Sequence, residues 1–221
     1  MDRVLLGLAY KFIYPWIRHK LQPQQQGHVI NYSEKDQALL NLKMKEGAVV
    51  VIVGSRGTGK TELAYRLAEF IDKPIYAISP EQVPHPSSIE LIGFEEIDEK
   101  VMPKSTVIFD DVPVYLSNRD YHDQLVRTIE RLVPMVRHDR KLHMIFITQT
   151  TGFADKYILD ADAIFIKPGS LLFEDLERPG MKKLYQVANP YFEGKDDNWI
   201  LRHCYMITRR WQGLVEIKKV S

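Results

Sequence analysis

The sequence predicts an α/β fold with three layers, in which helices cover a mainly parallel β-sheet. Short apolar runs alternate along the chain with segments of helical periodicity, and this alternation favours parallel strands joined by right-handed crossovers. The runs are continuously apolar, which is typical of strands buried on both faces. A glycine-rich loop joins one such run to a helical segment. This arrangement places the loop at the carboxyl ends of the strands.

The expected elements can be assigned in chain order. Ser33, with Asp36 three residues later, predicts the start of a helix that runs to about residue 45. Helical periodicity follows the glycine-rich loop to about residue 71 and recurs over residues 121–136. The apolar runs that predict buried strands are residues 48–53, 74–78, 106–109, 142–148 and 163–166.

Two further segments carry turn signals. Prolines 80, 84 and 86 predict a surface loop. Two β-rich runs between residues 199 and 219 flank Arg209 and Arg210. They predict an antiparallel hairpin at the edge of the sheet.

Composition limits the class of protein. The 221 residues are 45% hydrophobic and carry a formal net charge of +1, which suits one sizeable core with appendages. This balance argues against a protein that coats nucleic acid non-specifically, although local basic patches remain open. The single cysteine, Cys204, cannot form an intrachain disulfide. We therefore expect the protein to reside in the reducing interior of a cell, with Cys204 packed as a small apolar residue.

Residues 1–30 are expected to form an N-terminal amphipathic helix and linker, and residues 31–221 the main domain. Within residues 1–21 the apolar side chains fall along one helical face, and residues 22–27 are polar and flexible. The segment is too short and charged to span a bilayer, and no cleavage site follows it. Two interpretations stay open: a helix that docks on a neighbouring subunit or partner, and an interfacial membrane helix.

The glycine-rich loop has the pattern of a phosphate-binding loop. Its residues are Gly54, Ser55, Arg56, Gly57, Thr58, Gly59, Lys60 and Thr61. Glycines let backbone N–H groups converge on phosphates, Lys60 can reach the terminal phosphates, and the Thr61 hydroxyl can hold Mg²⁺ at a helix N-terminus. The loop therefore predicts binding of a nucleoside triphosphate, with ATP and Mg²⁺ as the expected cofactors.

Two acids follow the run at residues 106–109, about fifty residues after Lys60. A strand-end carboxylate can hold Mg²⁺, usually through water, so Asp110 is the predicted metal-associated acid. Asp111 is a candidate general base that would polarise the attacking water. In the alternative interpretation, Asp111 only caps the turn before Pro113.

Gln149 follows the run at residues 142–148. A neutral amide at this strand tip can orient water against the terminal phosphate without adding charge, so Gln149 is a predicted sensor. A loop glutamine without a role would look the same in the sequence. His143, inside the apolar run, is expected to be a core group rather than a catalyst.

Residues 140–149, with residues 54–61 and 107–111, resemble the corresponding segments of the FtsK/HerA superfamily of DNA-pumping ATPases. In that superfamily a basic residue, an apolar-His-apolar strand and a Thr-Gln end recur, and the similarity covers about residues 45–170. The small genome-packaging ATPases of viruses with internal membranes are most similar in size and layout, followed by zonula occludens toxin-like phage assembly proteins. The sequence departs from the pattern at Asp111, where a glutamate is usual, and at Lys141 and Leu142.

The resemblance implies a RecA-like P-loop NTPase core, a ring that is commonly hexameric, a DNA-lined channel and an arginine finger from the neighbouring subunit. Arg137 and Arg140 best match the basic position before the sensor strand. The other candidates lie on or near the preceding helix: Arg119, Arg127 and Arg131. For each arginine the alternative is a solvated helix face.

DNA contacts would need only a few cationic side chains in each subunit. The basic groups in expected loops are Lys104, Arg178, Lys182, Lys183, Arg209 and Arg210. None of them lies in a motif that recognises specific DNA bases, and contacts to the DNA phosphates alone would be sufficient for a motor. Scattered solubilising charge is an equally good interpretation of each of them.

These features predict a ring-forming, ATP-driven translocase of double-stranded DNA that packages a viral genome into a capsid. The expected location is the host cytoplasm, with virion or membrane association and a capsid or membrane protein contact through the N-terminal helix. One alternative is a zonula occludens toxin-like virion assembly or secretion ATPase at a membrane. The other is a small-molecule kinase, for which an arginine-rich lid is expected; no such arginine cluster follows Gln149.

Overall fold

The computed structural model describes residues 32–71, 73–79, 84–110, 140–148, 161–170 and 179–217. These belong to one compact unit, Tyr32–Ser221. The predicted N-terminal helix and linker and the predicted helix at residues 121–136 lie outside the described residues. Within the described ranges, no helix has the length and apolar character needed to cross a membrane.

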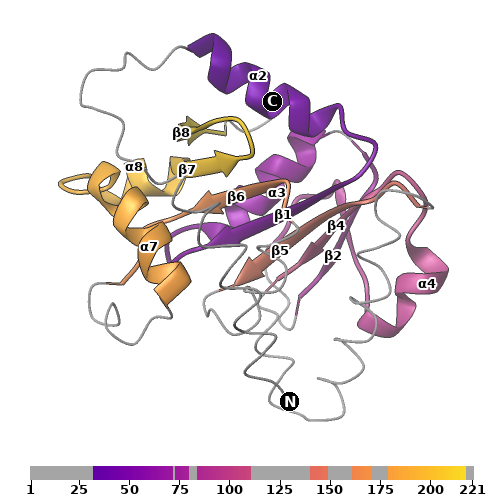
Figure 1. The fold of residues 1–221 in the computed structure, drawn as a ribbon. Helices are drawn as coiled ribbons and strands as arrows, with labels where there is room; N and C mark the ends of the chain where they lie inside the picture. The colour runs from indigo at the N-terminus through magenta and orange to yellow at the C-terminus, as the bar shows by residue number, and fades with distance from the viewer. Residues whose placement is uncertain are drawn as a thin grey trace, which may run out of the picture. The chain divides into compact units, whose positions relative to one another are not determined.

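One eight-stranded sheet forms the middle of this unit, in the order β3-β2-β4-β5-β1-β6-β7-β8 (Figure 1). All pairs among the first six strands of the chain are parallel, whereas β7 pairs antiparallel with both β6 and β8. The bounds are β1 (Ala48–Val53), β2 (Ile75–Ile78), β3 (Ile89–Leu91), β4 (Thr106–Phe109), β5 (His143–Thr148), β6 (Ala163–Ile166), β7 (His203–Thr208) and β8 (Gln212–Glu216). The predicted strands and the edge hairpin are confirmed, and β3 is an addition.

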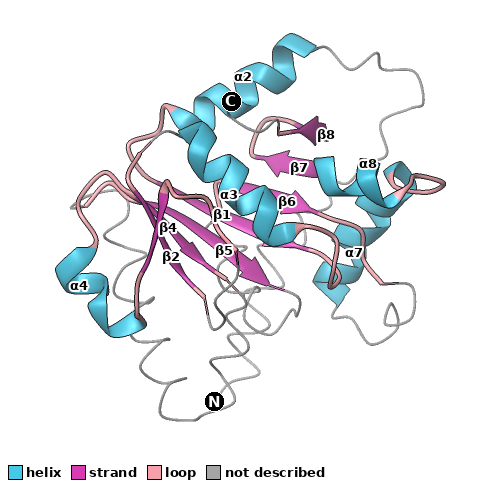
Figure 2. Ribbon diagram, turned by 180° about the vertical axis from the view of Figure 1, so that it is seen from behind, coloured by secondary structure: helices cyan, strands magenta, loops and turns pink. Residues whose placement is uncertain are grey.

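Helices cover both faces of the sheet, as the two opposite views show (Figures 1 and 2). Side chains of α2 and α3 pack in the core on one face, and side chains of α4 and α7 pack in the core on the other. The helix bounds are α2 (Tyr32–Lys43), α3 (Lys60–Ile71), α4 (Ile97–Lys100), α7 (Pro179–Ala188) and α8 (Asp197–Arg202), with short 3-10 turns η1 (Phe94–Glu96) and η4 (Asn189–Tyr191). The predicted three-layer α/β fold is confirmed.

Side chains alternate between the two cores along each strand, as the two-residue period of a strand requires. In β4, Val107 and Phe109 enter the core on the α7 face, and Ile108 enters the core on the α3 face. The Asp110 N–H donates to the Ile78 carbonyl at 2.9 Å, so the pairing with β2 extends past the end of β4. Asp110 therefore follows Ile108 onto the α3 face, where the phosphate-binding loop ends.

Two expectations about the C-terminal region are wrong. Residues 199–202, expected to belong to the β-rich stretch at residues 199–219, lie in the helix α8, and the Asp196 carboxylate caps this helix by accepting the Trp199 N–H at 2.8 Å. Lys182 and Lys183, expected in a loop, lie in α7. Its buried residues are Met181, Leu184, Tyr185 and Ala188, the spacing of an amphipathic helix. Pro179 at the first position suits a helix start.

Candidate nucleotide-binding site

The phosphate-binding loop occupies the turn between β1 and α3, at the carboxyl end of a central parallel strand. Gly59 has φ of 82°, a left-handed backbone that favours glycine. A Cβ at this position would lie 2.7 Å from Leu201 Cδ2 in α8. A Cβ on Gly54 would lie 2.5 Å from the Lys167 Cβ. The two glycines thus let neighbouring side chains pack directly against the loop backbone.

Within the loop, polar contacts converge on the Ser55 carbonyl. It accepts the Lys60 ammonium at 2.9 Å and the Thr58 hydroxyl at 2.8 Å. The Ser55 N–H donates to the Pro168 carbonyl at 3.0 Å, which ties the loop to the segment after β6. The Lys60 side chain therefore folds back over its own loop, where the terminal phosphates of a nucleotide would compete for the ammonium.

Thr61 and Asp110 meet at the end of this loop. The Thr61 hydroxyl donates to Asp110 Oδ2 at 2.9 Å, and Asp110 is buried with 6% of its surface exposed. A hydroxyl and a carboxylate are the hard oxygen ligands that suit Mg²⁺, which completes its shell with phosphate oxygens and water. No cluster of three or more His, Cys, Asp or Glu side chains that could hold a metal occurs in the described ranges. The pair fits a cation that arrives with the nucleotide.

Strand β5 lies between β1 and β4 in the sheet. Thr148 pairs with Val53, and Phe146 pairs with Phe109, so the tip of β5 lies between the loop and the acid-bearing strand. The residue after this tip is the predicted sensor, Gln149, which lies outside the described residues. Asp111 and Arg137 also lie outside them.

Arg140 is described, and the structure does not bring it to the phosphate-binding loop of its own chain. It precedes β5, and therefore lies at the amino edge of the parallel strands, opposite to the loop. One guanidinium nitrogen, Nη2, is 3.6 Å from Asp98 Oδ1. A role for Arg140 at a nucleotide would have to be played in a neighbouring protomer.

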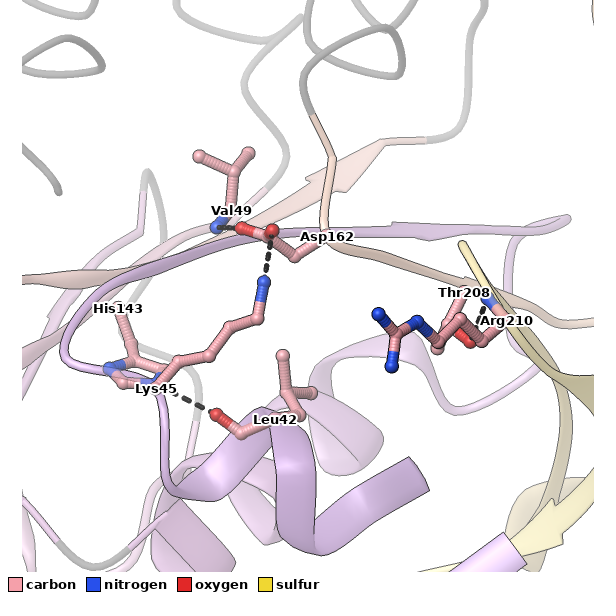
Figure 3. A network of polar contacts seen from close by, with 7 residues as sticks. All are labelled: Leu42, Lys45, Val49, His143, Asp162, Thr208 and Arg210. Carbon is pink, nitrogen blue, oxygen red and sulfur yellow. Dashed lines mark hydrogen bonds and ion pairs between the residues drawn. The ribbon is translucent and has the colours of Figure 1, made fainter. Parts of the chain in front are cut away.

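The same amino edge carries polar contacts around two buried side chains, Asp162 and His143 (Figure 3). Asp162 accepts the Lys45 ammonium at 2.5 Å and the Val49 N–H at 2.9 Å. His143 is fully buried, and its Nε2 lies 3.2 Å from the Leu42 carbonyl. These contacts fasten α2 and the chain after it to the starts of β1, β5 and β6. The expectation that His143 is a core group is confirmed.

Lys167 is a residue that no sequence pattern singled out. Its side chain is fully buried directly after β6, and the ammonium donates to the carbonyls of Ile200 (2.7 Å), Leu201 (2.9 Å) and His203 (2.8 Å) at the end of α8. Burial lowers the pKa of Lys167 to about 8. The backbone of Lys167 also contacts the loop region, because its N–H donates to the Val53 carbonyl at 2.8 Å. Lys167 therefore links the phosphate-binding loop to α8.

No protein-family model and no curated protein sequence matches the chain. Among solved structures, the cytoplasmic domain of the Type VII secretion ATPase EccC of Thermomonospora curvata is 13% identical, with a TM-score of 0.51 over 79% of this chain and 24% of that chain. A protein described simply as an ATPase is 12% identical, with a TM-score of 0.46 over 80% of this chain and 80% of that chain. The P4 protein of bacteriophage phi6 in complex with ADP is 12% identical, with a TM-score of 0.35 over 54% of this chain and 50% of that chain.

Sequence identity this low is informative about the fold alone. Of the three TM-scores, only the one for EccC exceeds 0.5. The chain spans about a quarter of the length of that protein, as the 24% coverage states. In the sheet of this chain, the loop-bearing β1 and the acid-bearing β4 flank β5. The chain therefore has the RecA-like α/β fold of a P-loop ATPase.

Proposed function

We propose that the protein binds ATP with Mg²⁺ and hydrolyses it at this site. The observation that carries the proposal is the 2.9 Å contact between the Thr61 hydroxyl and Asp110, which are 49 residues apart in sequence. The contact joins the start of α3, where the loop delivers Lys60, to the end of a buried strand. Hydroxyl, carboxylate and ammonium thus converge beside a glycine-rich turn, as phosphoryl transfer requires.

Each residue has a separate task in this proposal. Lys60 exchanges the Ser55 carbonyl for the terminal phosphates and offsets their charge, and Thr61 and Asp110 hold the metal. Mg²⁺, when bound there, would offset negative charge on the phosphates. Asp111 accepts a proton from the attacking water, and Gln149 orients that water. The neighbouring subunit supplies Arg137 or Arg140 to stabilise the charge that develops in the transition state.

We propose further that hydrolysis drives a ring-forming translocase of double-stranded DNA, most simply for packaging a viral genome. The support is the likeness of residues 140–149, 54–61 and 107–111 to DNA-pumping ATPases. A second candidate is a secretion ATPase that moves protein at a membrane. It is favoured by the EccC comparison, because that protein is a Type VII secretion ATPase. A membrane role of residues 1–21 would support this candidate, and lipid flotation with and without that segment measures it.

The test of the site separates binding from turnover. We expect Lys60→Ala to lose binding of a fluorescent ATP analogue, because the ammonium that meets the phosphates is gone. Asp111→Asn should keep binding and stop phosphate release. Lys104→Ala is a matched control, since Lys104 is an exposed lysine that precedes β4 at the opposite edge of the sheet. Wild-type turnover by Asp111→Asn would remove that residue from the mechanism, and wild-type binding by Lys60→Ala would refute the site.

A further inference from the structure

Tyr65 has a buried phenol whose hydroxyl lacks a hydrogen-bond partner among the described residues. Only 3% of the residue is exposed, and the hydroxyl itself is out of reach of bulk solvent. Leaving a polar group unsatisfied in this way is costly, and such groups in native proteins commonly meet an ordered water or an ion. The strand side chains that share this core with Tyr65, such as Ile108, Ile145 and Ile147, are apolar.

Tyr65 lies in α3, one helical turn after the end of the phosphate-binding loop. Tyr65 follows Thr61 by four residues in the same helix, so the two side chains share one face. Helical side chains lean toward the helix N-terminus and cover the preceding turn. Tyr65 is therefore expected to lie over the turn that carries Thr61, whose hydroxyl contacts Asp110.

The charge of Asp110 is felt at the phenol. Burial, followed by the negative charges of Asp110 and Glu62, raises the pKa of Tyr65 to about 12. Glu62 is exposed and paired with Arg66 at 2.9 Å, so Asp110 is the buried acid of the two. At neutral pH the phenol keeps its proton and can donate it to a water molecule that also contacts a carboxylate.

We propose that the Tyr65 hydroxyl positions a water molecule through which Asp110 holds the magnesium ion. The inference rests on the proposed ATPase function and adds one residue to its site. Tyr65 acts through this water and is a positioning residue. Phenylalanine would fill the same apolar space, so a hydroxyl that only packed there would bring a penalty without a benefit.

The test is Tyr65→Phe in the full chain, with a fluorescent ATP analogue titrated with MgCl₂. Because one hydrogen bond to the water is lost, we expect the half-saturating Mg²⁺ concentration to rise about three- to tenfold. Nucleotide affinity in EDTA should not change. The melting temperature without nucleotide should stay the same or rise, since an unsatisfied hydroxyl has been removed. If Tyr65 had only a structural role, Tyr65→Phe would not raise the half-saturating Mg²⁺ concentration while leaving nucleotide affinity in EDTA unchanged.

Two controls sharpen the experiment. Tyr76→Phe removes a phenol hydroxyl from β2, where the residue is similarly buried with 5% exposed, and should leave the Mg²⁺ dependence unchanged. In an Asp110→Asn background, Tyr65→Phe should have little further effect, because both act on the same water. An unchanged half-saturation in Tyr65→Phe, or an equal shift in Tyr76→Phe, would overturn the inference and leave the ATPase proposal standing. A wild-type protein that binds nucleotide without any Mg²⁺ dependence would overturn both.

Discussion

His143 is a titratable side chain that the interior of the sheet holds neutral. Its ring nitrogen Nε2 donates a hydrogen bond to the Leu42 carbonyl, and Nδ1 can then accept a hydrogen bond from the Lys73 ammonium at 3.0 Å. This pairing needs one protonated and one bare ring nitrogen, which is the neutral imidazole. Burial lowers the pKa of His143 to about 4, and the cation of Lys73 acts in the same direction. The buried histidine is therefore a point of sensitivity to acid.

We expect the free energy of unfolding to fall as the pH is lowered from about 6.5 to about 4. In this window the unfolded histidine binds a proton that the folded one excludes, and the loss from this residue reaches at most ~3 kcal/mol. Urea unfolding at several pH values measures it. His143→Gln should flatten the slope, whereas the exposed His85→Gln should not. An unchanged slope in His143→Gln would show that other groups cause the acid sensitivity.

At the scale of elements, α8 is a short helix whose position is determined by its contacts. Its C-terminal carbonyls accept the Lys167 ammonium, and Leu201 packs against the position where Gly59 lacks a side chain. The rings of Trp199 and His203 stack at 3.8 Å between centroids. Six residues are too few to form a stable isolated helix, so tertiary contacts hold α8 beside the phosphate-binding loop.

Lys167→Met should therefore loosen both α8 and the loop. The change removes a buried ammonium that donates to three backbone carbonyls, for which we expect a loss of about 2–4 kcal/mol in the free energy of unfolding. We also expect weaker binding of the fluorescent ATP analogue, because the loop packs on this residue. Denaturant unfolding and nucleotide titration measure the two effects. Lys195→Met, an exposed lysine over the Trp199 ring, is the matched control and should be near neutral. Equal effects of the two variants would contradict this account.

At the scale of the whole molecule, the two edges of the parallel strands differ in character. The carboxyl edge carries the glycine-rich loop, Thr61 and Asp110, and the amino edge carries the network of His143, Lys45 and Asp162. In our proposal the carboxyl edge binds the nucleotide with its metal, whereas the contacts at the amino edge hold α2 against the sheet. Arg140 lies at the second edge, so a nucleotide could meet it only across a subunit boundary.

For a ring motor, we expect the ATPase rate per protomer to rise with protein concentration and with linear duplex DNA. The rise with concentration follows if neighbouring subunits complete each site, and DNA binding should weaken steeply between about 50 and 200 mM salt. Phosphate release measured over a grid of protein, DNA and salt concentrations tests this. Doping with inactive Lys60→Ala protein should inhibit more than in proportion to its share. A constant rate per protomer that ignores DNA would argue against a ring translocase.

Local signals in the sequence predicted most of the described fold. The runs at residues 48–53, 106–109 and 163–166 became strands with the same bounds, because continuous apolar segments next to turns have few other stable forms in a sheet. The elements that the sequence did not predict either have a weak local signal or depend on contacts with distant parts of the chain. β3 has three residues, and α8 is held by contacts from elsewhere in the chain. The apolar spacing of α7 was present in the sequence and predicts a helix.

The sequence by itself determined the glycine loop, the strand-end acid and the α/β layering, because each depends on residues that are neighbours along the chain. Only the tertiary structure decided that Thr61 contacts Asp110, that Lys167 holds the end of α8, and that the Tyr65 hydroxyl is buried without a partner among the described residues. These contacts join segments that strand order and helix packing bring together. Backbone periodicity carries no information about distances across a sheet, and so the chemistry of the site was settled by packing.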